Sequence, residues 1–222
     1  MPRESFQDAI DDLEDDVLAL GETVASRLRR GVAAIESNDP ELARYVRDGD
    51  DEINELYLDI ESDCISLFSL EQPVAGDLRF VAASFKISTD LERVGDLASN
   101  LGEYVLEMEA ETPQRDALVE IGELAAEQLD DALTAYARGD AELCRTIEDR
   151  DDEVDEGCAQ AADDLVRDLV YQNPTTTPVD TTLASAQRVL LTIRDLERVG
   201  DHAVNVAART LYMVESDHEL LY

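Results

Sequence analysis

Residues 90–96 read Asp-Leu-Glu-Arg-Val-Gly-Asp, and residues 195–201 repeat the same seven letters in the same order, 105 positions later. Random sequence rarely produces an identical run of this length within one chain. A second match lies upstream of each copy, because residues 38–55 share nine of eighteen residues with residues 139–156 at an offset of 101. The chain therefore contains one unit twice, with the junction near residues 110–115.

Apolar residues recur at helical spacing around both copies. The first predicted helix has an apolar seam spaced by three and four residues, formed by Phe6, Ile10, Leu13, Val17, Leu20, Val24 and Leu28. Asp39 and Pro40 suit the N-cap and the first position of the next helix. The other predicted helices run from Pro40 to about Leu70, from Pro73 past Met108, from Thr112-Pro113 past Leu133, from Gly139-Asp140 to about Tyr171 and, after a loop at 173–178, past Met213.

No segment of the chain alternates apolar and polar residues with a period of two, so the pattern leaves no material for a sheet. We predict an all-α fold in which two three-helix bundles form a tandem repeat of six long helices. The predicted domains are residues 1–111 and residues 112–222.

The composition is strongly acidic. Of 222 residues, 53 are Asp or Glu and 18 are Lys or Arg, which gives a formal net charge of −35. This charge excludes sequence-independent binding to DNA, RNA or anionic lipid, each of which requires a basic footprint. Acidic chains are often disordered, but hydrophobic residues make up 44% and follow the helical pattern. We predict a folded protein from a halophilic source, where molar salt shortens the Debye length to about 3 Å.

Membrane and redox signals are weak in this sequence. It has no run of about 18 apolar residues and an acidic N-terminus, which predicts a soluble, cytoplasmic protein without direct membrane insertion. Cys64, Cys144 and Cys158 are widely spaced and lack a Cys-x-x-Cys pair, which argues against a disulfide framework or a thiolate zinc site. Each cysteine falls at an apolar helical position and is expected in the core.

The repeated motif places acidic side chains in rows. Glu92 and Asp96 are four residues apart, so both project from one helical face about 6 Å from each other, and Asn100 extends the row by a turn. Asp50 and Asn54 have the same spacing on the preceding helix. If the two helices face each other, the rows converge into a cluster of oxygen ligands. The equivalent residues of the second half are Asp151, Asp155, Glu197, Asp201 and Asn205.

Two interpretations of these rows remain open, a metal site and a solvated acidic face. Carboxylate-rich sites suit hard cations such as Mg²⁺, Mn²⁺ or iron, because close carboxylates repel unless a cation lies between them. In so acidic a chain, however, pairs four residues apart also occur by chance. The duplication includes Gly95 and Gly200 in mid-helix, where glycine costs about 1 kcal/mol relative to alanine. Such glycines indicate a close backbone approach or room for a ligand. Arg93 and Arg198 are expected to form salt bridges.

These features resemble the PhoU family of phosphate-uptake regulators. The resemblance rests on the two DLERVGD copies, on the Asp-x-x-x-Asn/Asp pairs that begin at Asp50 and Asp151, and on the two three-helix halves, and it covers about residues 6–215. It implies metal clusters held by acidic motifs on both bundles. Carried over by position, the first cluster would use Asp50, Glu92 and Asp96, and the second Asp151, Asp155, Glu197 and Asp201. Asn54 departs from the acidic pattern and removes one charge, so the first cluster is expected to be weaker or smaller.

The resemblance also implies a function. PhoU proteins are negative regulators of phosphate uptake that associate with the ATPase of the phosphate ABC transporter and, in bacteria, with a sensor kinase. We therefore expect a regulatory adaptor of phosphate homeostasis that binds metal ions, iron, manganese or magnesium, and works by protein–protein contact. A homodimer is plausible, because three-helix units expose apolar seams.

An enzyme is the main competing interpretation. Ferritin-like di-iron proteins also hold carboxylates inside helical bundles, but they use two Glu-x-x-His motifs from different helices, and this chain has one, Glu215–His218. It has no Walker-type phosphate loop and no nucleophile–base pair, so we expect no catalysis. His202, which has Leu97 at the equivalent position, is expected to be a surface or interface residue. A metal-free helical adaptor also remains open, although it leaves the duplicated acids and glycines unexplained.

Overall fold

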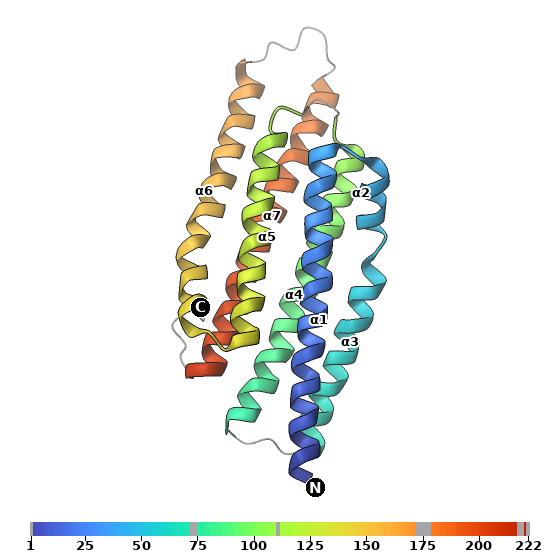
Figure 1. Cartoon of the computed structure of the whole chain (residues 1–222). Coiled ribbons are helices and arrows are strands. Elements are labelled where there is room, and N and C mark those ends of the chain that lie inside the picture. Colours follow the sequence, from blue (N-terminus) through green and yellow to red (C-terminus); the bar gives the residue numbers. More distant parts are fainter. Residues whose placement is uncertain (1, 72–74, 110–111, 172–178, 217–219, 221–222) are drawn as a thin grey trace.

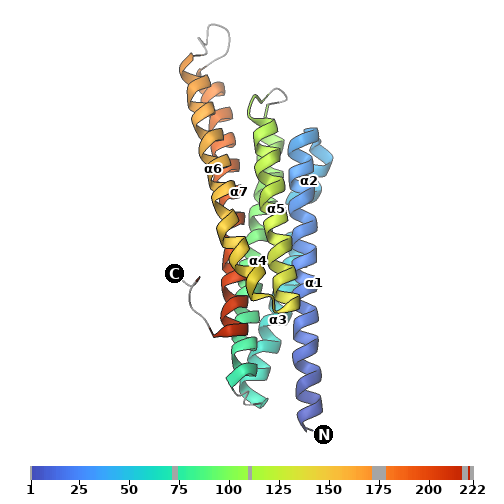
Figure 2. The same ribbon diagram turned by 60° about the vertical axis from the view of Figure 1, so that its left-hand side comes forward.

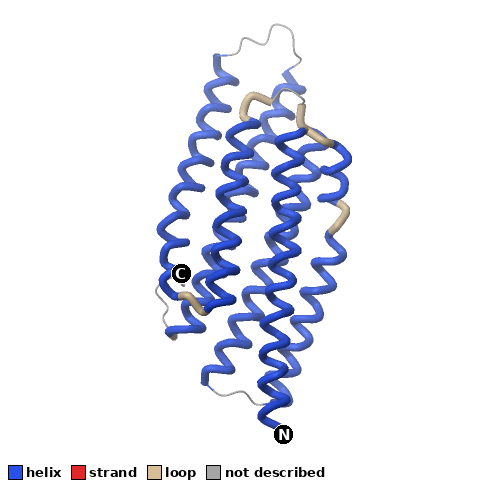
Figure 3. The backbone as a smooth tube through the Cα atoms, in the orientation of Figure 1, coloured by secondary structure: helices blue, strands red, loops and turns tan. Residues whose placement is uncertain are grey.

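The computed structural model describes residues 2–71, 75–109, 112–171, 179–216 and 220, and its regular elements are all helices (Figures 1 and 3). The elements are α1 (Pro2–Ser37), α2 (Pro40–Arg47), α3 (Asp50–Ser66), the π-helical turn η1 (Leu67–Glu71), α4 (Ala75–Glu107), α5 (Arg115–Arg138), α6 (Ala141–Tyr171) and α7 (Val179–Glu215). No strand occurs in these ranges, and the all-α prediction is confirmed.

The helices form two three-helix bundles that lie side by side. In the first bundle, α1 and α4 pack against each other and against α2 and α3; in the second, α5, α6 and α7 pack together. The bundles are joined along α4 with α7 and along α1 with α5. Figure 2 shows α6 and α7 at one edge of the elongated molecule, α1 and α2 at the other, and α4 and α5 between them.

One connected core runs through both bundles. The seam predicted for the first helix is buried from Ile10 to Leu28. All three cysteines are free and buried, as their apolar helical positions predict. Burial raises the pKa of Cys64 and of Cys158 to about 12, so both remain thiols. Across the described helices, none is both long and apolar enough to cross a membrane.

Equivalent turns begin the second helix of each half. Asp39 accepts hydrogen bonds from the backbone N–H groups of Glu41 and Leu42, and Asp140 does the same for Glu142 and Leu143. The preceding residues, Asn38 and Gly139, both adopt the left-handed conformation, with φ of 50° and 60°. This geometry suits asparagine and glycine and ends a helix. The predicted cap at Asp39-Pro40 is therefore confirmed.

The signal at Thr112-Pro113 predicts a helix start that lies two residues too early. The fourth predicted helix begins at Arg115, after an N-cap position at Gln114 that makes no side-chain cap bond. The hydroxyl of Thr112 instead donates to the carbonyl oxygen of Glu109. Because that bond points back into the connection, Thr112 stabilises the turn between the bundles and leaves the helix uncapped. Pro73 and the loop at 173–178 lie outside the described residues.

The second predicted helix, from Pro40 to about Leu70, is not continuous. Asp48 and Gly49 separate α2 from α3, and Figure 3 shows this interruption as a short loop. A Cβ atom on Gly49 would lie 2.5 Å from both terminal nitrogens of the Arg27 guanidinium. The equivalent residue of the second half is Arg150, within the continuous α6. The prediction of one continuous helix was wrong here, because Asp48 ends α2 and Gly49, against which Arg27 of α1 packs, begins α3.

Candidate metal sites on the two bundles

The structure brings together the four acids predicted for the second half. Asp151 and Asp155 lie on α6, and Glu197 and Asp201 lie on α7. Partial burial raises the pKa of Glu197, and the charges of Asp155, Asp201 and Asp151 raise it further. Burial and the charge of Asp201 likewise raise the pKa of Asp155. The two rows therefore converge across the α6–α7 interface, as the spacing predicts.

Asp151 is the innermost member of this cluster. The buried amide of Gln128 on α5 donates to its Oδ1 at 2.9 Å. A Cβ atom on Gly200 would lie 3.1 Å from the same oxygen. Burial raises the pKa of Asp151, the Gln128 bond lowers it, and the charges of Asp155 and Asp201 raise it again. The duplicated glycine thus lets the Asp151 carboxylate approach the backbone of α7.

The first half forms a smaller cluster from Asp50 on α3 and from Glu92 and Asp96 on α4. Burial raises the pKa of Glu92, and the charges of Asp96 and Asp50 add to this effect. Arg93 opposes it, since its guanidinium lies 3.5 Å from Glu92 and 3.2 Å from Asp96. Asn54 donates to Oδ2 of Asp50 at 2.7 Å. The predicted residues therefore lie within electrostatic range of one another. Arg93 forms the salt bridge that we expect.

Gly95 has a packing role in the first half. A Cβ atom there would lie 2.9 Å from the side chain of Ile53. The glycine therefore permits close approach of α3 to α4, and the space beside it is filled by an apolar side chain. Close packing, one of the two explanations open for these glycines, applies here.

Asn100 and Asn205 each form a hydrogen bond to the other bundle. The Asn100 amide donates to Asp195 at 3.1 Å, and the Asn205 amide donates to Asp90 at 3.3 Å. Asp90 and Asp195 are the first residues of the two motif copies. The asparagine that follows the first copy therefore bonds to the second copy, and the asparagine that follows the second copy bonds to the first. The assignment of Asn100 and Asn205 as metal ligands stays a prediction, and their amide nitrogens connect the bundles.

Sequence reasoning missed these two aspartates as functional positions. Asp195 is fully buried and also accepts from Tyr104 at 3.0 Å and from Arg194 at 2.6 Å. Asp90 lies 2.9 Å from Nδ1 of His202, which places His202 at the interface, as expected. The signal was available, because both aspartates belong to the repeated letters. Apart from Arg194, which neighbours Asp195 on α7, their partners lie on the other bundle.

The carboxylates match a hard cation in donor type and charge. Within the described ranges, no Lys or Arg forms an ion pair with Asp151, Asp155, Glu197 or Asp201. Close carboxylates without a counterion favour a divalent cation. In the same ranges, however, no group of three or more His, Cys, Asp or Glu side chains is close enough to hold one ion. In the described arrangement, therefore, these carboxylates do not form a three-ligand site.

A family model described as the PhoU domain matches residues 17–105 and again residues 118–210. The two matches contain both motif copies and both acidic clusters. The chain belongs to the PhoU family. The starts of the matched ranges differ by the same 101 positions that relate the second helices of the two halves, so the family match and the internal repeat agree.

PhoU relatives match along nearly the whole chain. The phosphate-specific transport system accessory protein PhoU homologue of Pseudomonas aeruginosa is 31% identical over 95% of this chain and 86% of its own length. The Synechocystis homologue is 33% identical over 98% of this chain and 94% of its own length. The crystal structure of PhoU from Pseudomonas aeruginosa has a TM-score of 0.88 at 30% identity and covers 96% of this chain and 100% of that chain. These matches confirm the predicted family and fold.

The PhoU relatives are named as accessory proteins of a transport system, which confirms the prediction that the chain is not an enzyme. The single Glu-x-x-His motif adds nothing to a di-iron interpretation. The carboxylate of Glu215 is paired with Arg145 at 2.6 Å, and His218 lies outside the described residues.

Proposed function

We propose that this PhoU-family chain is a regulatory accessory protein that restrains phosphate uptake through the phosphate ABC transporter. The observation that carries the proposal is the similarity to named accessory proteins of the phosphate-specific transport system, at 31–33% identity over most of both chains. The agreement in fold with PhoU crystal structures supports it.

The proposed mode of action is protein–protein contact in the cytoplasm. The partner is the ATPase of the transporter, and a sensor kinase is a second partner where the organism has one. The chain acts as a homodimer in this proposal. A pair of bundles joined by one core supports a role as a docking platform.

The regulatory claim is tested with the transporter. Tagged full-length protein should recover the transporter ATPase from cells grown in high phosphate, whereas a tagged unrelated acidic protein should not. A deletion strain should take up phosphate without the normal reduction in high phosphate. Absence of recovery together with normal control of uptake in the deletion strain would refute the proposal.

We also propose that the acidic clusters bind metal ions, iron, manganese or magnesium. The four unpaired carboxylates of the second half and the raised pKa values of Glu92 and Glu197 support this proposal, because a bound cation would relieve the repulsion. The metal would fix the geometry of each helix pair or form part of the docking surface.

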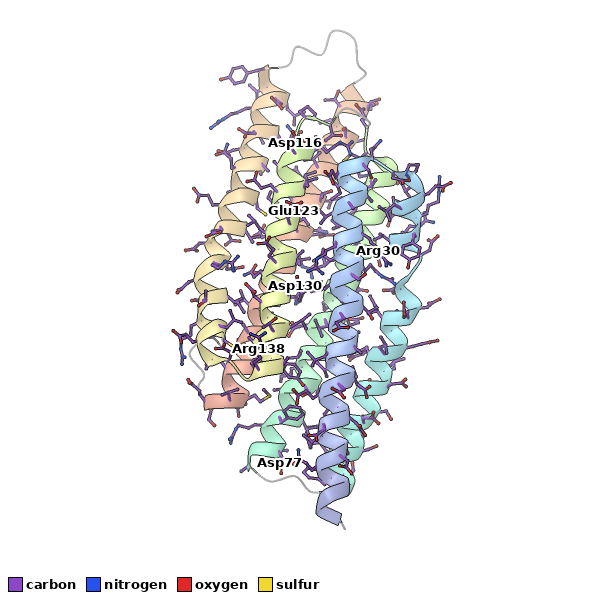
Figure 4. The ribbon with its side chains drawn as sticks, in the orientation of Figure 1. Arg30, Asp77, Asp116, Glu123, Asp130 and Arg138 are labelled. Atoms are coloured by element: carbon purple, nitrogen blue, oxygen red, sulfur yellow. The ribbon has the colours of Figure 1, made fainter. Side chains whose placement is uncertain are left out.

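Elemental analysis of protein purified without chelator tests the metal claim. Replacing Glu92, Asp96, Glu197 and Asp201 by Ala should abolish bound metal. The matched control removes four exposed acids outside the clusters, Glu41, Asp116, Glu120 and Glu123, two of which are labelled along α5 in Figure 4. Unchanged metal content in the first variant would place the ligands elsewhere. Equal loss in both variants would indicate cations held only by the acidic surface.

A further inference from the structure

Arg27 is a buried cation that packs against Gly49, the residue before Asp50 of the first acidic cluster. Its side chain, on α1, is 6% exposed and packs against the backbone at Gly49. Its Nη1 is buried without a hydrogen-bond partner. The paired carboxylate is that of Glu52, at 3.8 Å, and Glu52 is 69% exposed. A buried charge with so weak a partner is costly, so a better partner should lie nearby.

Asp50 is the cluster residue next to this glycine in sequence, and it too has a buried atom without a partner. It follows Gly49 directly, and its Oδ1 is buried without a hydrogen-bond donor. Its other oxygen accepts only the neutral amide of Asn54. A buried cationic donor and a buried carboxylate oxygen thus both lack partners around one glycine. A contact between the two groups, direct or through water, would satisfy both.

The second half shows the same contact with a neutral donor. At the offset of 101, Gln128 takes the place of Arg27 and Asp151 takes the place of Asp50. There the amide of Gln128 donates to Oδ1 of Asp151 at 2.9 Å. The interaction that remains open in the first half is therefore formed in the second.

The cation of the second half is directed elsewhere. Arg150, which replaces Gly49, lies 2.8 Å from Asp131 and 3.9 Å from Glu127, both on α5. It is thus neutralised by acids outside the cluster. Gly49 has no side chain, and this absence leaves the space that Arg27 fills in the first half.

We propose that Arg27 is a built-in counter-cation for the first acidic cluster, so that only the second cluster depends on a bound metal for neutralisation. At the aligned positions the first half has Arg27 where the second has Gln128, and Asn54 where the second has Asp155. The cation that replaces Gly49 in the second half, Arg150, pairs with acids outside the cluster. The two halves therefore bind metal unequally, and the second half fills first. This inference rests on the proposed metal binding of the PhoU-type clusters.

Reciprocal exchange of the two residues tests the inference in the full chain. Mn²⁺ affinity is measured by calorimetry in two backgrounds, one lacking the second site (Glu197→Ala, Asp201→Ala) and one lacking the first (Glu92→Ala, Asp96→Ala). In the former, Arg27→Gln should tighten Mn²⁺ binding by about tenfold or more, and Arg27→Lys should leave it weak because the charge is retained. In the latter, Gln128→Arg should weaken binding by a similar factor. Equal affinity of both halves in the unmodified chain, or no change with Arg27→Gln, would overturn the inference.

A second measurement needs no bound metal. In chelator and low salt, Gln128→Arg should raise the melting temperature by at least about 2 °C, because it neutralises the unpaired second cluster. Arg27→Gln should have a lower melting temperature than Arg27→Lys. If Gln128→Arg does not fold, the comparison of these two variants tests the inference. If Arg27→Gln and Arg27→Lys have the same melting temperature, the proposed role of Arg27 is overturned. Absence of Mn²⁺ binding in every variant, by contrast, would refute the proposed metal function and leave this comparison valid.

Discussion

At the scale of single residues, the two identical motifs differ in what surrounds their first aspartate. Asp195 is fully buried and accepts hydrogen bonds from Asn100, Tyr104 and Arg194. Asp90 is half-buried and is contacted by His202 and Asn205. Asn100 and Tyr104 of α4 bond to Asp195 of α7, and His202 and Asn205 of α7 contact Asp90 of α4. Both sets of contacts hold the two bundles together. The same residue type therefore carries unequal energetic weight in the two copies.

Removing the two aspartates in turn should expose this inequality. Asp195→Ala leaves Tyr104 and Asn100 without their acceptor inside the interface, and we expect it to lower the free energy of unfolding by about 2–4 kcal/mol. Asp90→Ala, at a partly solvated position, should cost about 1 kcal/mol. Urea unfolding followed by circular dichroism measures both values. Equal losses would show that burial of Asp195 does not set its contribution.

At the scale of helices, glycine controls how closely neighbours pack. Gly102 on α4 lies against the backbone of α2, where an added Cβ atom would be 2.5 Å from the Ala43 carbonyl oxygen and 2.8 Å from the Arg47 nitrogen. Backbone atoms cannot rotate away as the end of a side chain can. Gly76, near the start of the same helix, has no atom within 4 Å of the added position. These two glycines form a matched pair within one element.

Alanine at the two positions should have opposite effects. Gly102→Ala should force α2 away from α4 and destabilise the protein by about 1–3 kcal/mol, the usual range for overpacking. Gly76→Ala should be neutral or stabilising by up to about 1 kcal/mol, since alanine favours the helix and meets no obstacle. Thermal unfolding of both variants provides the comparison. A stable Gly102→Ala protein would mean that α2 moves freely, in conflict with its buried residues Ala43 and Val46.

At the scale of the whole molecule, net charge opposes folding. Most acidic residues lie on solvated surfaces, and Figure 4 shows Asp116, Glu123 and Asp130 following one another along α5. Of these, Asp130 forms an ion pair, with Arg29. The converging acids of the clusters add repulsion at positions that are partly shielded from water. Both features make the stability of the fold depend on solution conditions.

Stability should fall as pH rises through the mildly acidic range. The pKa values of Glu92, Asp151, Asp155 and Glu197 are raised above the ordinary 4.5 for Glu and 3.8 for Asp, first by burial and then chiefly by neighbouring carboxylates. A raised pKa means that the folded state holds the proton more tightly than the unfolded state does. Its stabilising contribution is complete below the ordinary value and is lost as pH rises through the raised one.

We therefore expect the urea midpoint, measured with chelator, to decrease between about pH 4 and pH 7. Replacing the four residues by Gln or Asn should flatten the profile, because these amides do not titrate. A midpoint that rises with pH over this range would contradict the assignment of burial and repulsion as the dominant effects.

Salt should stabilise the protein near neutral pH. With a net charge of −35, molar KCl shortens the screening length to about 3 Å and weakens repulsion between carboxylates. We expect the melting temperature at pH 7 to rise steadily with KCl, in agreement with the predicted halophilic source. The rise should shrink near pH 4, where more of the carboxylates are protonated. An equal salt effect at both pH values would point to a cause other than charge screening.

The features that the sequence alone determined depend on residues close to one another in the chain. The seam from Ile10 to Leu28 and the capping residues Asp39 and Asp140 act within one helix or one turn, so spacing and residue type suffice to predict them. The repeated DLERVGD letters determined the twofold organisation, and the four-residue spacing of Glu197 and Asp201 determined that they share a face. The same reasoning brought the acidic rows of each half together, because neighbouring helices of a three-helix bundle must face each other.

Only the tertiary structure decided which residues lie opposite one another between distant elements. Asn100 continues the row of Glu92 and Asp96 in sequence, yet it bonds to Asp195 because α7 lies at that side of α4. The contact of Arg27 with the backbone at Gly49 follows from the packing of α1 against α2 and α3. Helical spacing determines the face on which a side chain lies, whereas its charge partner is set by the neighbouring helix. Two identical motifs therefore acquired different surroundings.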